Sequence, residues 1–97
     1  MTIEIKRNKE EIVLQVAGRL DTTTAPAFDK AIVENINTKS LILDFKKLEY
    51  ISSAGLRVLL SAQKKIGQFG TMKVINVCEE VMEVFEMTGF ADILTIE

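Results

Sequence analysis

Two adjacent serines, Ser52 and Ser53, are the residues with the clearest chemical potential in this sequence. They follow an apolar run at residues 41–45 and a short hydrophilic stretch, and an amphipathic segment comes after them. This pattern predicts a strand, a short loop and a helix that begins at the serines. The first N–H groups of a helix lack intrahelical partners and carry a partial positive charge. A serine at this position can therefore cap the helix, and it can also carry a phosphate group.

The residues around the serines offer little support for catalysis. The sequence contains no histidine, which excludes a Ser/His/Asp hydrolase, and we expect Lys46 and Lys47 to be solvated loop residues rather than replacement bases. The glycine-rich phosphate-binding patterns GxxxxGK[ST] and GxGxxG do not occur. Cys78 is the single cysteine, so it cannot form an internal disulfide, and we expect it to fill space between a strand and a helix.

Three carboxylates, those of Asp21, Asp44 and Glu49, could meet at one end of a sheet and hold Mg²⁺, although their spacing is unspecific. Asp21 precedes three threonines, where it would either shape a turn or belong to a functional site. Asp44 lies inside an apolar strand, where an acid needs hydrogen-bond partners. A structural or site role is therefore favoured over simple solvation for Asp44.

Length and composition indicate an ordinary globular protein. The 97 residues are 47% apolar and 27% charged, so we expect a single domain spanning residues 1–97. The net charge of −2, with both signs spread along the chain, argues against a nucleic-acid partner. No apolar stretch approaches the ~20 residues needed to span a bilayer, and no signal-peptide core is present. We therefore expect a cytoplasmic protein with no membrane partner.

The hydrophobic pattern predicts an α/β fold with the order β-β-α-β-α-β-α-β. Strands are expected at residues 2–6, 12–17, 41–45, 72–77 and 93–96, and Gly89 should end the third helix. The strand at 41–45 is almost continuously apolar, so we expect it to be central and covered on both faces. Right-handed crossovers would then give a mixed, mostly parallel sheet of about five strands with three main helices. We also expect an apolar group around the third helix to belong to the core rather than to a docking surface; its members are Met82, Phe85, Met87 and Phe90.

Three segments carry a resemblance to a known family: GRLD at residues 18–21, LDF at 43–45 and ISSAGLRVLL at 51–60. Together with the length and the order of elements along the whole chain, they resemble the STAS domain. The similarity is greatest to the stand-alone bacterial anti-sigma factor antagonists. The serine-to-leucine segment is its most specific part.

The resemblance implies a protein-binding switch that regulates transcription. In that family the unmodified antagonist binds an anti-sigma factor, which is also an ATP-dependent serine kinase, and so frees the sigma factor. Phosphorylation of a serine at the start of the second helix ends the binding, and a phosphatase restores it. By this resemblance the phosphate acceptor is Ser53, with Ser52 as second choice, and no catalytic residue or cofactor is implied. The implied partner-binding residues are Asp21, Thr22, Ser52, Ser53, Ala54, Gly55 and Arg57.

One departure from the family pattern keeps other interpretations open. Switches of this family commonly carry an aspartate directly before the acceptor, whereas this chain has Ser52. The serine pair could act only as a helix cap. The chain could also be a scaffold or adaptor that is never phosphorylated and joins a signalling or transport assembly through the same surface. An enzyme that uses Asp21, Asp44 and Ser53 on a nucleotide is the least supported alternative.

Overall fold

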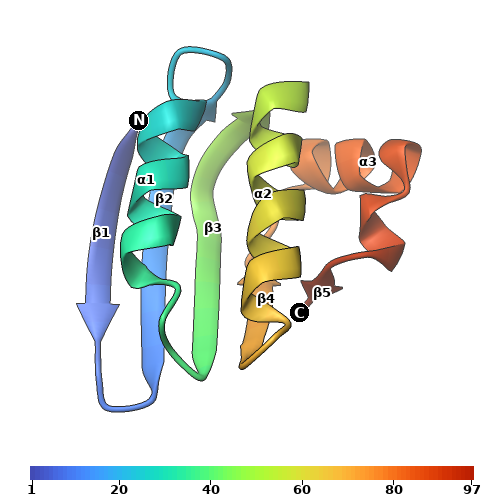
Figure 1. Cartoon of the computed structure of the whole chain (residues 1–97). Helices are drawn as coiled ribbons and strands as arrows, with labels where there is room; N and C mark the ends of the chain where they lie inside the picture. The colour runs from blue at the N-terminus through green and yellow to red at the C-terminus, as the bar shows by residue number, and fades with distance from the viewer.

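Five strands form one mixed sheet in the computed structural model, which describes residues 1–97. They lie in sequence order across the sheet, with β1 antiparallel to β2 and each later pair parallel (Figure 1). This arrangement confirms the predicted α/β class and the predicted order of elements. No helix is long and apolar enough to cross a membrane. The elements are β1 (Thr2–Arg7), β2 (Glu11–Leu20), α1 (Ala25–Asn35), β3 (Ser40–Ile51), α2 (Ser53–Ile66), β4 (Thr71–Ile75), α3 (Glu79–Thr88), the 3₁₀ turn η1 (Phe90–Asp92) and β5 (Thr95–Ile96).

The main core lies between the sheet and helices α1 and α2, which cover the same face (Figure 1). Leu41, Leu43 and Phe45 point toward these helices and are fully buried, whereas the alternating residues Ile42 and Asp44 are only partly covered. The strand is central, as predicted, but the expectation that both of its faces are covered is wrong. The physical reason is that α1 and α2 both pack on one side of the sheet.

The strand β3 extends beyond its predicted end, so the expected loop at residues 46–50 is wrong. Its register against β2 shifts twice, and β3 carries one extra residue at each shift. The first extra residue places both Lys46 and Lys47 in exposed positions between the buried Phe45 and Leu48. The hydrophilic residues that suggested a loop are therefore outward-facing residues of a bulged strand.

Helix α3 lies at the β4–β5 side of the molecule, beyond α2 (Figure 1). Its Phe85 is fully buried, and Gly89 ends it in the left-handed conformation with φ 82°, as predicted. Met82 and Phe90 are half-buried, but Met87 is 86% exposed, so its assignment to the core is wrong. The last strand is also shorter than predicted, because η1 and the turn after it occupy the chain up to β5.

Candidate partner-binding site

The serine pair lies where β3 ends and α2 begins. Ser52 is the residue before the helix and has an extended backbone, with φ −101° and ψ 177°. Its N–H donates a hydrogen bond to the carbonyl of Leu20 at 2.8 Å, and its own carbonyl accepts one from the N–H of Leu56 at 3.0 Å. The start of α2 is therefore held against the end of β2 by backbone hydrogen bonds.

The two serines differ in accessibility. Ser53 is exposed, whereas the Oγ atom of Ser52 is buried and has no hydrogen-bond partner. No serine side chain caps α2, so the interpretation of the pair as a helix cap is wrong. Because the first-turn N–H groups of a helix lack intrahelical acceptors, the start of α2 keeps its donor character. Ser53 is the serine of this pair that another protein can reach.

The loop before α1 is organised by Asp21. Its Oδ1 atom accepts hydrogen bonds from the hydroxyl of Thr23 at 2.7 Å, the N–H of Thr23 at 3.0 Å and the N–H of Thr24 at 3.3 Å. The hydrogen bond from the Thr23 hydroxyl, together with those from the backbone, lowers the pKa of the Asp21 carboxyl. Asp21 therefore shapes the turn and remains ionised at neutral pH, while Thr22 beside it is exposed.

The Asp21 loop and the start of α2 lie at the same end of the sheet (Figure 1). The hydrogen bond between Ser52 and Leu20 joins the two segments, and Asp21 and Ser53 are the residues that directly follow this pair. Arg57, one turn further along α2, is exposed, and Ala54 is half-buried. The structure thus brings the predicted acid, the predicted acceptor and an arginine to one end of the molecule.

Gly55 is buried and allows α2 to lie close to the sheet. A Cβ atom on Gly55 would lie 2.7 Å from Cγ of Leu20 and 2.8 Å from Cγ1 of Ile51, which is closer than carbon atoms can approach. Its contacts are with these core side chains rather than with solvent. Gly55 therefore sets the position from which Ser53 is presented.

Two residues at this end of the sheet have no role in the site predicted from sequence. The Arg19 guanidinium carbon lies 4.2 Å from the centre of the Tyr50 ring, in cation–π geometry. Both residues are exposed, and they are register partners on β2 and β3. Only the second register shift pairs them, so the sequence gives no signal for the contact. Arg19 lies two residues before Asp21, and Tyr50 lies three residues before Ser53.

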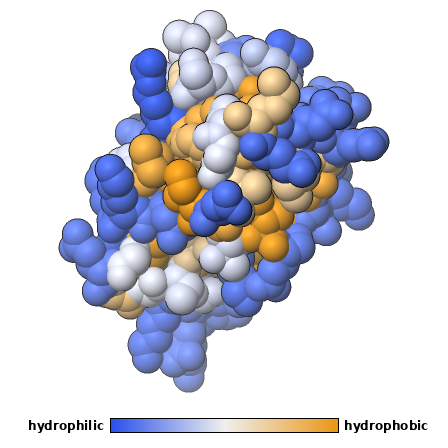
Figure 2. Space-filling model, turned by 90° about the vertical axis from the view of Figure 1, so that its right-hand side faces the viewer, coloured by the Kyte–Doolittle hydropathy of each residue, from blue (hydrophilic) through white to orange (hydrophobic).

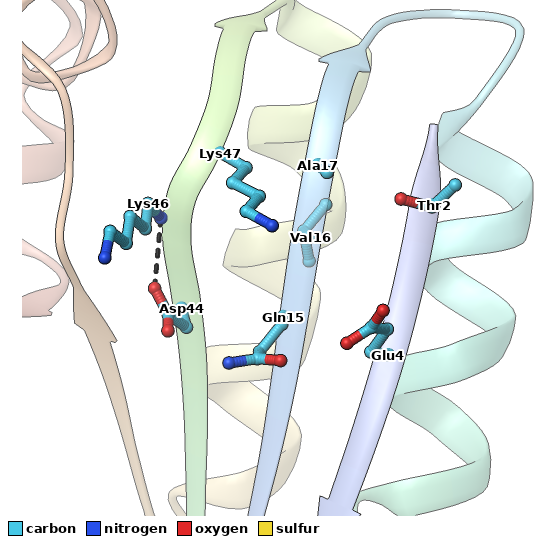
Figure 3. Close-up of a pocket in the computed structure, with 8 residues that line it drawn as sticks. All are labelled: Thr2, Glu4, Gln15, Val16, Ala17, Asp44, Lys46 and Lys47. Atoms are coloured by element: carbon cyan, nitrogen blue, oxygen red, sulfur yellow. Dashed lines mark hydrogen bonds between the residues drawn. The ribbon is translucent and has the colours of Figure 1, made fainter.

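The three carboxylates considered as possible Mg²⁺ ligands do not form a cluster, because no three His, Cys, Asp or Glu side chains come close enough together to hold a metal ion. Asp44 is instead bound by its neighbours: its Oδ1 atom accepts hydrogen bonds from the Asn76 amide at 3.1 Å and the Lys46 N–H at 3.0 Å. It lines a shallow pocket of about 90 Å³ on the face of the sheet that α1 and α2 leave uncovered (Figure 3). None of the predicted partner-binding residues lines this pocket.

Asp44 makes folding stability depend on pH. Partial burial opposes its ionisation, but the hydrogen bonds from Asn76, Lys46 and Gln15 outweigh this effect and hold the pKa of Asp44 below its ordinary value of 3.8. The resulting stabilisation is complete above about pH 3.8 and is lost as the pH falls through the lower pKa of the folded protein.

Asn76→Gly tests this dependence, because Asn76 has φ 57° and glycine adopts that conformation without strain. We expect the pKa of Asp44 to rise in the variant, as measured by NMR titration of its carboxyl carbon, while the titration of Asp21 stays unchanged. The free energy of unfolding that is lost on acidification below about pH 3.8 should be smaller in the variant than in the original protein. An unchanged Asp44 titration would contradict the assignment.

Comparison with known proteins places this fold in a family. The chain matches the family model of the STAS domain over residues 2–97. The anti-sigma-B factor antagonist of Bacillus subtilis (strain 168) is 29% identical over 98 residues, which cover 99% of this chain and 90% of that protein. The chain therefore belongs to the STAS domain family.

Solved structures share the same fold. An anti-sigma factor antagonist from Mycobacterium paratuberculosis has a TM-score of 0.90 at 24% identity, with 98% of this chain and 83% of that chain covered. SpoIIAA in its unphosphorylated form has a TM-score of 0.76 at 17% identity, with 99% of this chain and 87% of that chain covered. The Bacillus cell fate determinant SpoIIAA in its phosphorylated form also has a TM-score of 0.76, at 18% identity, with 99% and 91% covered.

Proposed function

We propose that this protein is an anti-sigma factor antagonist that binds its anti-sigma factor when unmodified and is released when Ser53 is phosphorylated. The observation that carries the proposal is the exposed Ser53 at the uncapped start of α2, joined through Leu20 and Ser52 to the Asp21 loop. The relative from Bacillus subtilis, named an anti-sigma-B factor antagonist, supports the assignment of function. SpoIIAA, which has this fold and is known in both phosphorylation states, supports the mechanism.

The charges at this end of the molecule explain how a phosphate would act. A phosphoserine carries about −1.5 to −2 charges and three acceptor oxygens. The free N–H groups and positive end of α2 would stabilise it by up to ~1 kcal/mol, so the antagonist itself stays folded. A partner, in contrast, would have to desolvate this charge beside the ionised Asp21. Phosphorylation therefore removes the partner without unfolding the domain.

In this scheme the protein has two kinds of partner and catalyses no reaction itself. The anti-sigma factor would act as the serine kinase, a phosphatase would restore binding, and the exchange would take place in the cytoplasm. Asp21 shapes the loop and contributes charge, while Thr22, Ala54 and Arg57 surround Ser53 as contact residues. The antagonist is a binding protein in this scheme, with no cofactor and no catalytic residue of its own.

Incubation with the cognate anti-sigma kinase and ATP tests the proposal. Mass spectrometry should find one added phosphate on Ser53, and it should find none on the Ser53→Ala variant. Ser52→Ala should be phosphorylated like the original protein, because the Oγ atom of Ser52 is buried. Phosphate on Ser52 alone, or on neither serine, would refute the assignment of Ser53.

A constitutive scaffold is the second candidate, and Ser52 in place of the usual aspartate is the feature that favours it. The same incubation separates the two functions. A stable complex with the anti-sigma factor that survives ATP, with no phosphate gained, would support the scaffold and refute the switch.

A further inference from the structure

Apolar side chains are exposed on the outer face of α3 and directly after the turn η1. Met87 is 86% exposed and Ile93 is 46% exposed, and Phe90 between them is half-buried. Figure 2, which faces the side where α3 lies in Figure 1, shows apolar surface gathered in the middle of this side with hydrophilic side chains around it. Exposed apolar groups that lie together and are rimmed by polar residues mark interaction surfaces.

The charged residues that follow Lys73 in the sequence are all acidic. All 12 basic residues of the chain lie at or before Lys73, while six of the 14 acidic residues follow it. Glu97 pairs with Lys73 at 3.1 Å, and the other five acids form no salt bridge. The near-neutral net charge of the whole chain therefore conceals an acidic C-terminal part. Its acids without a salt bridge are Glu79, Glu80, Glu83, Glu86 and Asp92, of which Glu80 lines a groove with Lys46 and Lys47 and the others do not.

Helical spacing places the apolar and acidic groups on the same outer surface. Val81 and Phe85 face the core, whereas Glu83 and Met87, four residues apart, are both exposed and neighbour each other on the opposite side of α3. Methionine is unbranched and polarisable, so it adapts to partners of different shape. An apolar side chain set among carboxylates complements a segment that carries both an apolar anchor and positive charges.

We propose that this surface, formed by the outer face of α3, η1 and Ile93, is a second docking site for a cationic, amphipathic segment of a protein partner. The carboxylates attract the segment and orient it, and Met87 with Ile93 contacts its apolar side. An acidic partner or an anionic membrane would be repelled by the same charges. The site lies on the far side of α2 from α1, and it contains no residue of the site around Ser53 (Figure 1).

Titration with a synthetic helical peptide of leucine and lysine tests the proposal, with the same peptide carrying glutamate for lysine as the negative probe. The four methionines give methyl NMR signals that report the place of binding. We expect saturable shifts of the Met87 signal, while the signal of Met72, buried in the core, stays in place. The glutamate peptide should cause no shift.

Variants identify the contribution of each group. Met87→Ser should weaken binding of the lysine peptide about tenfold, and so should the double variant Glu83→Lys with Glu86→Lys. Val33→Ser is the matched control, because Val33 is an exposed apolar residue on α1, and it should bind as before. Ser53→Asp should also bind as before, which separates this site from the proposed switch. Equal binding by Met87→Ser and Val33→Ser, or equal shifts with the two peptides, would overturn the proposal.

Discussion

Replacement of Ser53 by aspartate is expected to weaken the complex with the anti-sigma factor about 100-fold, whereas Ser53→Ala should preserve it. The variant adds a carboxylate next to the ionised Asp21, and the partner must desolvate that charge to bind. A cost of several kcal/mol for like charges or unpaired charge in an interface corresponds to a loss of this size. Alanine removes only the hydroxyl of an exposed residue that forms no cap, so the surface keeps its shape and charge.

Isothermal titration calorimetry with the purified anti-sigma factor measures the effect. Gln68→Asp is the matched control, because Gln68 is exposed in the turn that follows the other end of α2, and it adds the same charge. This control should bind within about threefold of the original protein. The loss caused by Ser53→Asp should decrease at higher ionic strength, since salt screens exposed charges. Equal affinities of the alanine and aspartate variants would show that charge is not what controls binding.

Gly55→Ala is expected to lower the free energy of unfolding by about 2 kcal/mol. The added methyl group would meet Leu20 and Ile51, which are buried side chains without free space around them. Overpacking of this kind costs about 1–3 kcal/mol, and the better helix propensity of alanine offsets up to ~1 kcal/mol. The change would also push the start of α2 away from β2, so we expect weaker binding of the anti-sigma factor at temperatures where the variant is folded.

Urea unfolding at neutral pH provides the measurement. Ser53→Ala is the matched control, because it changes an exposed position of the same helical turn, and its stability should stay within about 0.5 kcal/mol. Gly55→Val should be less stable than Gly55→Ala, since its larger side chain meets the same two neighbours. If Gly55→Ala is as stable as the original protein, the start of α2 has more room than the structure indicates.

The sequence alone determined the order of the elements, and it supplied the candidate site residues. Alternation and helical spacing are local properties, so the order of strands and helices and the left-handed end of α3 at Gly89 followed from them. The serine pair and Asp21 became candidates through the resemblance of the segments that contain them to the STAS domain, since the local sequence was equally compatible with a helix cap and a turn. The excess of acidic residues after Lys73 can also be read from the sequence. It indicates a docking surface only together with the exposure of Met87, which the structure shows.

Tertiary structure decided which of these groups can be reached. Neither the extra residues in β3 nor the pairing of Arg19 with Tyr50 can be predicted from one strand, because register depends on both partners. The resemblance favoured Ser53 over Ser52, and the packing of α2 against β2 and β3 supplies the physical difference, because it buries the Oγ atom of Ser52 and leaves Ser53 exposed. The local pattern of residues determines where strands and helices form. The burial of a side chain depends instead on the segments packed against it, and these lie far away in the sequence.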